Sequence, residues 1–335
     1  MAKVSIIGTG TWGIALGILL QGNGHEVVAW SALQDEVKEL KEKRVHKNLP
    51  GVILPEELEI TDDLAYACKE RELLVLAVPS VFTRSVSKQM NPYIEKGQII
   101  VNVAKGIEET TLMTLSEQIE QEIPNATVAV LSGPSHAEEV SRGIPTTCVV
   151  GAKEKAIAEK IQTIFMNATF RVYTSPDIIG IELGGALKNV IALAAGIADG
   201  LGYGDNTKAA LITRGSAEIT RLGVAMGGKE QTFYGLSGIG DLIVTCASMH
   251  SRNRRAGILI GKGYTMEEAM KEVNMVVEGV YSAKAAYQLG KKYHINLPII
   301  EQVNAVLFDH KSARVAVNEL MVRDKTIEYG DLPWE

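Results

Sequence analysis

A lysine and an aspartate stand in two apolar stretches where charged residues are costly. Lys188 lies in GGALKNVIA at 184–192, and Asp241 lies in GIGDLIVTC at 238–246. An unpaired buried carboxylate is expensive, so Asp241 needs a cationic or hydrogen-bonding partner, and Lys188 is the natural candidate. A lysine in a crowded apolar site has its pKa lowered toward neutral pH, which suits it to general acid/base chemistry.

Both stretches also have structural explanations. At helical spacing, Gly184 and Gly185 clear space on the face of Lys188 and its neighbour Asn189. Adjacent helical glycines each cost about 1 kcal/mol relative to alanine, and close helix packing alone would account for them. Simple helix capping would likewise account for Asp241.

The only dense basic cluster is SRNRR at 251–255, in a chain of net charge −6. Arginine forks match phosphate oxygens bidentately, so the cluster predicts a phosphate site. A short basic run can also bind nucleic acid. An acidic chain has no global attraction to nucleic acid or anionic membranes, so we expect neither as a partner.

Near the N-terminus, GTGTWG at 8–13 follows the apolar run VSII and opens a helical segment. In this context Gly8 permits a tight turn, Gly10 lets the backbone approach a pyrophosphate, and Gly13 lets the helix pack on the strand. The helix N-terminus offers free amides to the phosphates. The pattern predicts a dinucleotide site. The residues after the next strand, Ser31 and Ala32, are neither acid nor arginine, which leaves NAD and NADP both open.

Two further turns follow predicted strands and should face the same crevice. Lys105 lies in AKGIE at 104–108, where it would meet an anionic substrate or the nicotinamide; a solvated surface lysine is the alternative. The turn SGPSHAEE at 132–139 suits close approach of a ligand, or an ordinary helix start with Ser135 as N-cap and Glu138 completing a capping box. His136 has no obvious partner and is interpreted as structural.

The elements that must position these residues fall into two kinds. Strands are predicted at 4–7, 26–30, 73–78, 98–103, 127–131 and 146–150, with helices at 12–21, 35–43 and 111–122 between them. This alternation indicates a Rossmann-type doubly wound parallel sheet. Helical periodicity follows at 177–200, 206–227, 231–247, 252–262, 265–273, 279–293 and 298–308. We predict an α/β dinucleotide-binding domain at 1–175 and an all-α substrate domain at 176–335.

Composition agrees with an ordinary globular protein, at 46% apolar and 22% charged residues over 335 positions. The three cysteines, Cys68, Cys148 and Cys246, are far apart, which predicts buried thiols and no disulfide framework. No Cys/His spacing suggests a metal site. We expect a cytoplasmic protein without a signal peptide.

Together these motifs resemble the bacterial type of NAD(P)-dependent glycerol-3-phosphate dehydrogenase. The resemblance runs nearly end to end and also includes VPS at 78–80, ITRG at 212–215 and VVEGV at 276–280. It implies reversible reduction of dihydroxyacetone phosphate to sn-glycerol 3-phosphate, which feeds phospholipid synthesis. It also implies NAD or NADP as cofactor and, by resemblance alone, a homodimer through the helical domain.

The resemblance makes Lys188 the catalytic proton donor and acceptor. It implies substrate contacts for Lys105, Gly133, Ser135, Lys188, Asp241, Ser251, Arg252 and Asn253. It implies cofactor contacts for Gly8, Gly10, Thr11, Trp12, Gly13, Ala32, Lys105, Ala137, Arg252, Val276 and Glu278. The family commonly has a basic residue at the position of Ala32, and its loss here puts strong NADP preference in doubt.

The implied mechanism passes a hydride to the ketone carbon while Arg252 and Asn253 hold the phosphate. Lys188, oriented by Asp241, protonates the alkoxide, and an ammonium stabilises the oxyanion without a metal. One alternative is a two-domain hydroxyacid or ketopantoate reductase, which has no need of SRNRR. The other is a non-catalytic nucleotide sensor, which has no need of Lys188 and Asp241.

Overall fold

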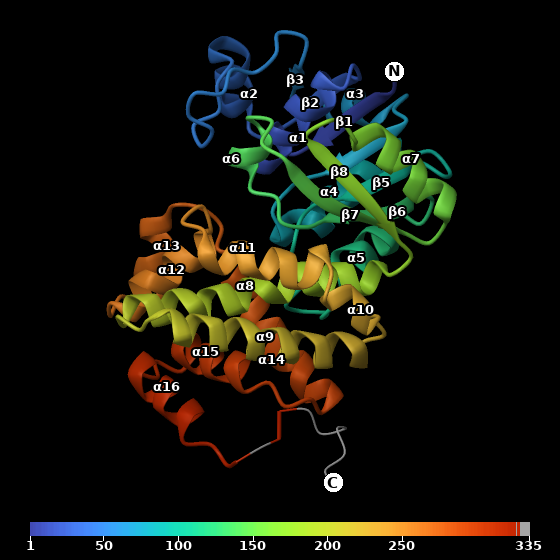
Figure 1. Ribbon diagram of the computed structural model, residues 1–335. Coiled ribbons are helices and arrows are strands. Elements are labelled where there is room, and N and C mark those ends of the chain that lie inside the picture. Colours follow the sequence, from blue (N-terminus) through green and yellow to red (C-terminus); the bar gives the residue numbers. More distant parts are fainter. Residues whose placement is uncertain (326, 329–335) are drawn as a thin grey trace.

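The computed structural model describes residues 1–325, 327 and 328. The remainder of the predicted 176–335 domain, residues 326 and 329–335, lies outside the described residues. A sheet with helices on its faces forms one half of the molecule, and a stack of helices forms the other (Figure 1). The predicted division at residue 175 falls in the connection between them.

The sheet has the strand order β3-β2-β1-β4-β5-β6-β7-β8. Its strands are β1 (Lys3–Ile7), β2 (Glu26–Trp30), β3 (Glu59–Thr61), β4 (Leu73–Leu76), β5 (Ile99–Asn102), β6 (Thr127–Ser132), β7 (Thr146–Ala152) and β8 (Phe170–Ser175). The first six run parallel, and the chain turns to opposite sides of β1 when it passes to β2 and to β4. A ligand crevice opens outside the carboxyl ends of strands at such a switch point.

The helices of this half are α1 (Thr11–Gly22), α2 (Gln34–Lys43), α3 (Leu64–Cys68), α4 (Thr83–Met90), α5 (Leu115–Glu122), α6 (Ala137–Val140) and α7 (Lys155–Phe165). The helix predicted at 111–122 begins only at Leu115, because Thr114 and Glu117 form a capping box there. The three cysteines are buried and free, as expected.

One part of the predicted sheet is wrong. Strand β7 was expected to be parallel, but it runs antiparallel to β6, with β8 parallel to β7. A parallel crossover needs a helix that spans the sheet face, and the β6–β7 connection holds only the single turn of α6. Strands β3 and β8 carry too few apolar residues to be recognised from the sequence; in β8 only Phe170 and Val172 are buried.

The helical half surrounds α8 (Ile178–Gly200), which is buried almost throughout. Around it lie α9 (Asp205–Ala225), α10 (Glu230–Phe233), α11 (Asp241–Ala247), α12 (Arg252–Gly261), α13 (Met266–Val273), α14 (Glu278–Tyr293), α15 (Pro298–Phe308) and α16 (Ala313–Met321). Helix α8 is long and apolar enough to cross a membrane, but 94% of its most apolar window is buried by protein. It is the core helix of this half.

Close backbone contact joins α8 to α12. A Cβ on Gly196 would lie 2.2 Å from the carbonyl oxygen of Arg254, and one on Gly257 would lie 2.3 Å from that of Leu193. Any side chain there would push the helices apart. This packing fixes the N-terminus of α12, with Arg252 and Asn253, relative to Lys188 in the middle of α8.

The helix predicted at 231–247 is interrupted. Residues Leu236–Gly240 form a π-helical turn, η3, between α10 and α11. The turn is possible because a Cβ on Gly238 would lie 2.0 Å from the carbonyl oxygen of Phe233. Such turns are frequent at functional sites. This one delivers Asp241 to the interface with the sheet. Helix α16 was not predicted.

Candidate active site

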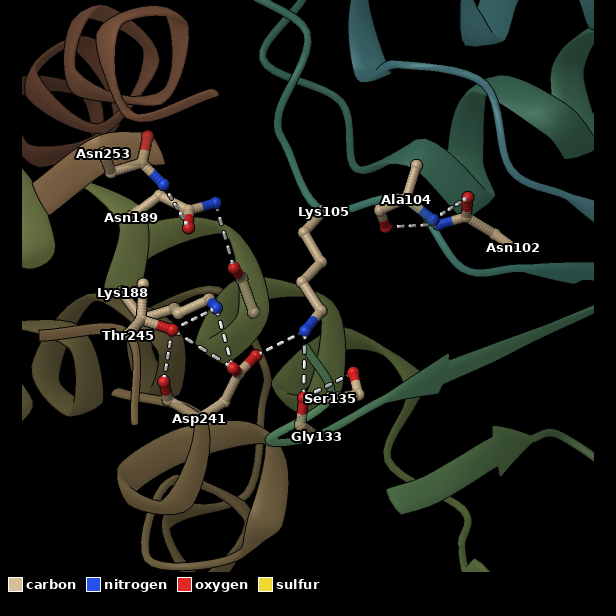
Figure 2. A network of polar contacts seen from close by, with 11 residues as sticks. Asn102, Ala104, Lys105, Gly133, Ser135, Lys188, Asn189, Asp241, Thr245 and Asn253 are labelled. Atoms are coloured by element: carbon tan, nitrogen blue, oxygen red, sulfur yellow. Dashed lines mark hydrogen bonds and ion pairs between the residues drawn. The ribbon is translucent and has the colours of Figure 1, made fainter. Parts of the chain in front are cut away.

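Two lysines and one aspartate form an ion cluster where the helical half meets the carboxyl edge of the sheet. Asp241 is 1% exposed. Its Oδ1 accepts a hydrogen bond from Lys188 Nζ at 2.7 Å, and its Oδ2 accepts one from Lys105 Nζ at 2.6 Å. Figure 2 shows the carboxylate between the two ammonium groups. The predicted partnership of Lys188 and Asp241 is confirmed, and Lys105 joins it.

Additional hydrogen bonds hold each lysine in place. Lys188 Nζ donates to Thr245 Oγ1 at 2.6 Å, and that hydroxyl donates to the carbonyl of Asp241 one turn earlier at 2.6 Å. Lys105 Nζ donates to the carbonyl of Gly133 at 3.0 Å. In the described chain, each ammonium therefore has two acceptors for three protons. One proton of each remains for a ligand.

The loop before Lys105 is fixed by Asn102 at the end of β5. Its side-chain Oδ1 accepts from the amide of Ala104 at 3.1 Å, and its Nδ2 donates to the carbonyl of Ala104 at 3.2 Å (Figure 2). Asn102 Nδ2 also lies 3.4 Å from Glu182 on α8. The sheet and the central helix of the second half are thereby joined directly beside the cluster.

Burial and the charge of the ion-pair partner shift the pKa values of Lys188 and Asp241 in opposite directions. Burial lowers the pKa of Lys188 to about 8, although Asp241 opposes the shift and Lys105 adds to it. Burial alone would raise the pKa of Asp241, but the ammonium groups of Lys105 and Lys188 outweigh it and hold that pKa below its usual range. Lys188 can therefore exchange a proton near neutral pH while Asp241 stays ionised.

The glycines near Lys188 combine packing with clearance. A Cβ on Gly184 would lie 2.7 Å from the carbonyl oxygen of Ser237 in the π-helical turn, so this glycine allows close packing. A Cβ on Gly185 would lie 3.5 Å from Cγ of Lys105 and 2.9 Å from Ser132 Oγ. The space it leaves accommodates Lys105, not Lys188. Capping does not explain Asp241, whose side chain makes no capping bond to α11.

A pair of asparagines extends the site toward α12 and α14. Asn253 Nδ2 donates to Asn189 Oδ1 at 2.9 Å (Figure 2). Asn253 Oδ1 accepts from the amide of Gly279 at 2.8 Å. Both are buried. Asn253 therefore orders three helices, and one Nδ2 proton remains for a ligand.

The residues of the basic cluster at 251–255 have different roles. Arg254 is structural, since it pairs with Asp199 at 2.8 Å and donates to the carbonyl of Ala247. Ser251 Oγ caps α12 by accepting from the amide of Arg254. Arg252 is half-buried, and its guanidinium makes no hydrogen bond or ion pair with any described residue. The amides of Arg252 and Asn253 precede the first hydrogen bond within α12. This constellation fits an anion.

The glycine turn has the geometry expected of a pyrophosphate loop. Gly8 has φ +118°, and a Cβ there would lie 2.9 Å from the backbone of Ala77. A Cβ on Gly10 would meet nothing within 4 Å, so the backbone is open to a ligand. The first hydrogen bond within α1 runs from Ile14 to Gly10, which leaves the amides of Thr11 to Gly13 unused by the helix. The residues present fit a dinucleotide phosphate.

Gly13 makes the tightest of these contacts. A Cβ at this position would lie 2.0 Å from the carbonyl oxygen of Gly8. Trp12 is half-buried and packs on the core, and Asn48 donates to Thr11 Oγ1 at 3.3 Å. Helix α6, which begins at the buried Ala137, packs against α1.

Glu278 lies at the start of α14 and bridges to the VPS turn. Its carboxylate accepts from the amide of Ser80 at 3.1 Å and from the Ser80 hydroxyl. Burial raises its pKa, against the Ser80 hydrogen bonds. Glu278 lies close enough to Arg252 for its charge to raise the pKa of that guanidinium, against the burial that lowers it. Val276, half-buried, precedes it in the turn between α13 and α14.

Comparison with known proteins decides the family. The family model described as NAD-dependent glycerol-3-phosphate dehydrogenase N-terminus matches residues 3–158, and the C-terminus model of the same family matches residues 177–318. The chain belongs to the NAD-dependent glycerol-3-phosphate dehydrogenase family. This assignment excludes the hydroxyacid and ketopantoate alternative.

Curated relatives and a solved structure agree over the full chain. A glycerol-3-phosphate dehydrogenase (NAD(P)+) of Fusobacterium nucleatum is 65% identical over 331 residues, 98% of this chain and 99% of the relative. The one from Agathobacter rectalis is 62% identical and covers 100% of both chains. The crystal structure of the Coxiella burnetii glycerol-3-phosphate dehydrogenase superposes with TM-score 0.93 at 36% identity, covering 96% of this chain and 99% of that one.

One local prediction about the dehydrogenase site is wrong, and two residues that contact the site, Thr245 and Glu36, were missed. Ser135 does not cap α6: the N-cap is His136 and no capping-box bond forms, because Ser135 Oγ donates instead to the carbonyl of Gly133. Thr245 was missed, although its position four residues after Asp241 on a helix was a readable signal.

Glu36 is the other missed residue, and the interpretation of His136 as structural stays a prediction. The ring of His136 lies 5.7 Å from that of His250, and burial with the nearby charge of Lys188 lowers its pKa. Glu36 reaches the glycine turn from α2, as described below. The sequence around Glu36 and His136 does not indicate these contacts, because only the fold brings each residue to its partners.

A substitution at Gly13 tests whether its close contact with Gly8 is needed for stability and cofactor binding. We expect Gly13→Ala to destabilise the protein by about 2 kcal/mol, because overpacking of this kind costs 1–3 kcal/mol, and to weaken dinucleotide binding at least tenfold by displacing α1. Chemical unfolding and titration with the reduced cofactor measure the two effects.

Gly22→Ala is the matched control on the same helix. Nothing lies within 4 Å of a Cβ there. Alanine should leave binding unchanged and stability equal or slightly higher. Equal binding by the two variants would contradict the assigned role of the Gly8–Gly13 turn.

Proposed function

We propose that this chain interconverts dihydroxyacetone phosphate and sn-glycerol 3-phosphate, with Lys188 as general acid and base. The buried Lys105–Asp241–Lys188 cluster carries the proposal. It places one exchangeable proton, on a lysine of pKa about 8, at the carboxyl edge of a dinucleotide-type sheet. A sensor that binds nucleotide without chemistry has no need of such a costly group.

The cofactor site would be formed by the residues around the glycine turn. Gly8, Gly10, Thr11, Trp12 and Gly13 would hold the pyrophosphate on the N-terminus of α1. Ala32 would border the adenosine ribose, and Lys105, Ala137, Arg252, Val276 and Glu278 would border the nicotinamide half. When bound, NAD(P)H supplies the hydride.

The substrate phosphate would bind at the start of α12. Arg252 has a guanidinium free of partners among the described residues, and two amides beside it are unused by the helix. Ser251 and Asn253 would contribute by holding this turn, and Asn253 by its remaining proton. Gly133 and Ser135 would border the carbonyl end, since Gly133 already accepts from Lys105.

The proton steps follow from the ion cluster. In the reduction, Lys188 Nζ donates a proton to the oxygen that develops negative charge at the substrate carbonyl. Asp241 keeps the ammonium oriented and raises its pKa against the burial that lowers it. Lys105 adds a second positive charge next to the same oxygen and stabilises it electrostatically. In the oxidation, neutral Lys188 takes the proton back.

The direct test follows the absorbance of the reduced cofactor with dihydroxyacetone phosphate, using NADH and NADPH side by side. Ketopantoate and unphosphorylated dihydroxyacetone serve as comparison substrates. We expect rapid oxidation only with the phosphorylated ketone. Absence of turnover with that substrate, or equal turnover with ketopantoate, would overturn the proposal.

Arg252→Ala tests the phosphate site. Hydrogen bonds to charged groups are worth about 1.5–3 kcal/mol, so KM for dihydroxyacetone phosphate should rise about 10- to 100-fold with a smaller change in kcat. The poor activity with unphosphorylated dihydroxyacetone should stay the same, which controls for misfolding. An unchanged KM would remove Arg252 from the phosphate site.

By resemblance we also propose a cytoplasmic enzyme that supplies glycerol 3-phosphate for phospholipid synthesis, and a homodimer formed through the helical half. Large apolar side chains on and after α16 support the latter: Val315, Met321 and Val322 are 48%, 79% and 70% exposed. Light scattering of the purified protein tests the dimer.

A further inference from the structure

An acidic side chain lies against the glycine turn although none follows β2 directly. Glu36 is the third residue of α2, and its Oε2 accepts hydrogen bonds from two hydroxyl groups. One is Thr9 Oγ1 at 2.6 Å, between Gly8 and Gly10; the other is Ser31 Oγ at 2.6 Å, directly after β2. The carboxylate therefore bridges the pyrophosphate turn and the carboxyl end of the second strand.

Helix capping does not explain this placement. The first turn of α2 receives no side-chain capping bond. The amide of Leu33, just before the helix, donates to Ser31 Oγ at 3.2 Å and not to Glu36. Both hydroxyls that contact Glu36 are buried, at 2% and 5% exposure for Thr9 and Ser31. Glu36 itself is half-buried, and its Oε1 has no partner among the described residues.

The location is the one at which Rossmann-type sites distinguish the two nicotinamide cofactors. A carboxylate there accepts hydrogen bonds from the ribose hydroxyls of NAD, and an arginine there accommodates the 2′-phosphate of NADP. In most such sites the acid ends the second strand. Here it lies on α2, six residues after Trp30, the last residue of β2. Its free oxygen is the acceptor that the ribose needs.

We propose that Glu36 selects NAD(H) over NADP(H) by accepting a hydrogen bond from the 2′-hydroxyl and repelling a 2′-phosphate. The proposal rests on the cofactor site proposed above. The hydroxyl of Ser31, directly after β2, is already engaged by Glu36 and by the amide of Leu33.

No described cation is placed to compensate a 2′-phosphate. Ala32 and Leu33 are exposed and uncharged. The guanidinium of Arg44 is committed to the carbonyls of Leu58, at 2.9 Å, and Pro55. Burial lowers the pKa of His46, which lies near Glu36 and Thr9, and so disfavours its positive charge. Lys38 and Lys47 are exposed, and neither forms an ion pair with Glu36.

Calorimetric binding of ADP-ribose and ADP-ribose 2′-phosphate tests the proposal without any turnover. Wild-type protein should bind ADP-ribose at least tenfold more tightly than the 2′-phosphate. In Glu36→Gln this ratio should fall at least tenfold, partly through tighter binding of the 2′-phosphate. Glutamine keeps an oxygen for Thr9 and Ser31, and a gain in affinity for one ligand cannot come from loss of structure.

Asp35→Asn is the matched control. Asp35 lies in the same first turn of α2 and carries the same charge, but it is exposed. Its ratio should stay within twofold of the wild type. Tighter wild-type binding of the 2′-phosphate, or a ratio unchanged in Glu36→Gln, would overturn the role of Glu36 and leave the cofactor site standing. Binding of neither ligand would overturn both.

Discussion

Lys188→Met should lower kcat for the reduction of dihydroxyacetone phosphate about a thousandfold while leaving cofactor affinity within about threefold. General acid catalysis contributes 10²- to 10⁴-fold. The other ammonium of the cluster, that of Lys105, stays hydrogen-bonded to Asp241 and Gly133. Methionine fills nearly the same volume, so no large cavity forms. Asp241 keeps Lys105 as its partner. Single-turnover kinetics and a cofactor titration measure the two quantities.

A second lysine–aspartate pair in the helical half supplies the control. Lys208 contacts Asp199 at 2.9 Å, and Asp199 also keeps a second cation, Arg254, at 2.8 Å. This arrangement copies that of Asp241 but lies outside the candidate site. Lys208→Met should retain normal kcat. If Lys188→Met turned over at a comparable rate to Lys208→Met, Lys188 would not be the proton donor.

The pairing of Lys188 with Asp241 was predictable because each charged residue lies in an apolar stretch of the sequence, which indicates burial. A charged residue inside an apolar run must have a partner, and only a few candidates exist in the chain. The glycine turn was predictable because each of its three glycines is required by the local backbone. Gly8 has a φ of +118°, the backbone at Gly10 is open, and a Cβ on Gly13 would lie 2.0 Å from the carbonyl oxygen of Gly8.

Other parts of the site depend on tertiary contacts that leave no local pattern. Lys105 was expected to meet a ligand, but its pairing with Asp241 requires the π-helical turn, and that turn depends on contact between Gly238 and Phe233. Glu36 looks like any surface acid on an amphipathic helix. Only the fold brings it to Thr9 and Ser31.

The strands of the sheet also differ in how far their own residues determine them. Strands β1, β2, β4, β5 and β6 were predictable because they are largely apolar and buried on both faces. The direction of β7 depends on the length of the connection before it, and β8 carries only alternating burial. Neither property is set by the strand residues themselves.

Asp241→Asn should have the second large effect, and its signature is the pH profile. In the wild type, reduction requires protonated Lys188, so kcat should fall as pH rises through about 8. Asp241 raises the pKa of Lys188 against burial, so its replacement lowers that pKa further. The alkaline limb should move down by at least about one pH unit, and activity near pH 8 should fall at least about fivefold.

Stability gives an independent check of the same electrostatics. Removing one partner of a buried ion pair costs about 3–5 kcal/mol, because Lys105 and Lys188 lose their common counter-ion. A lysine whose folded pKa lies below its unfolded value favours unfolding at low pH, since the unfolded chain binds the extra proton. The free energy of unfolding of Asp241→Asn should therefore rise between about pH 7 and 9 by more than that of the wild type, at up to about 1.4 kcal/mol per pH unit for one proton.

Asp199→Asn separates this electrostatic role from general loss of structure. Asp199 also holds two cations, Lys208 and Arg254, but neither lies in the candidate site. Its replacement should lower stability without moving the pH limb of kcat. If Asp241→Asn and Asp199→Asn lost stability alike and both kept the wild-type pH limb, Asp241 would be a structural anchor. A limb that moves only in Asp241→Asn requires that its charge acts on the proton of Lys188.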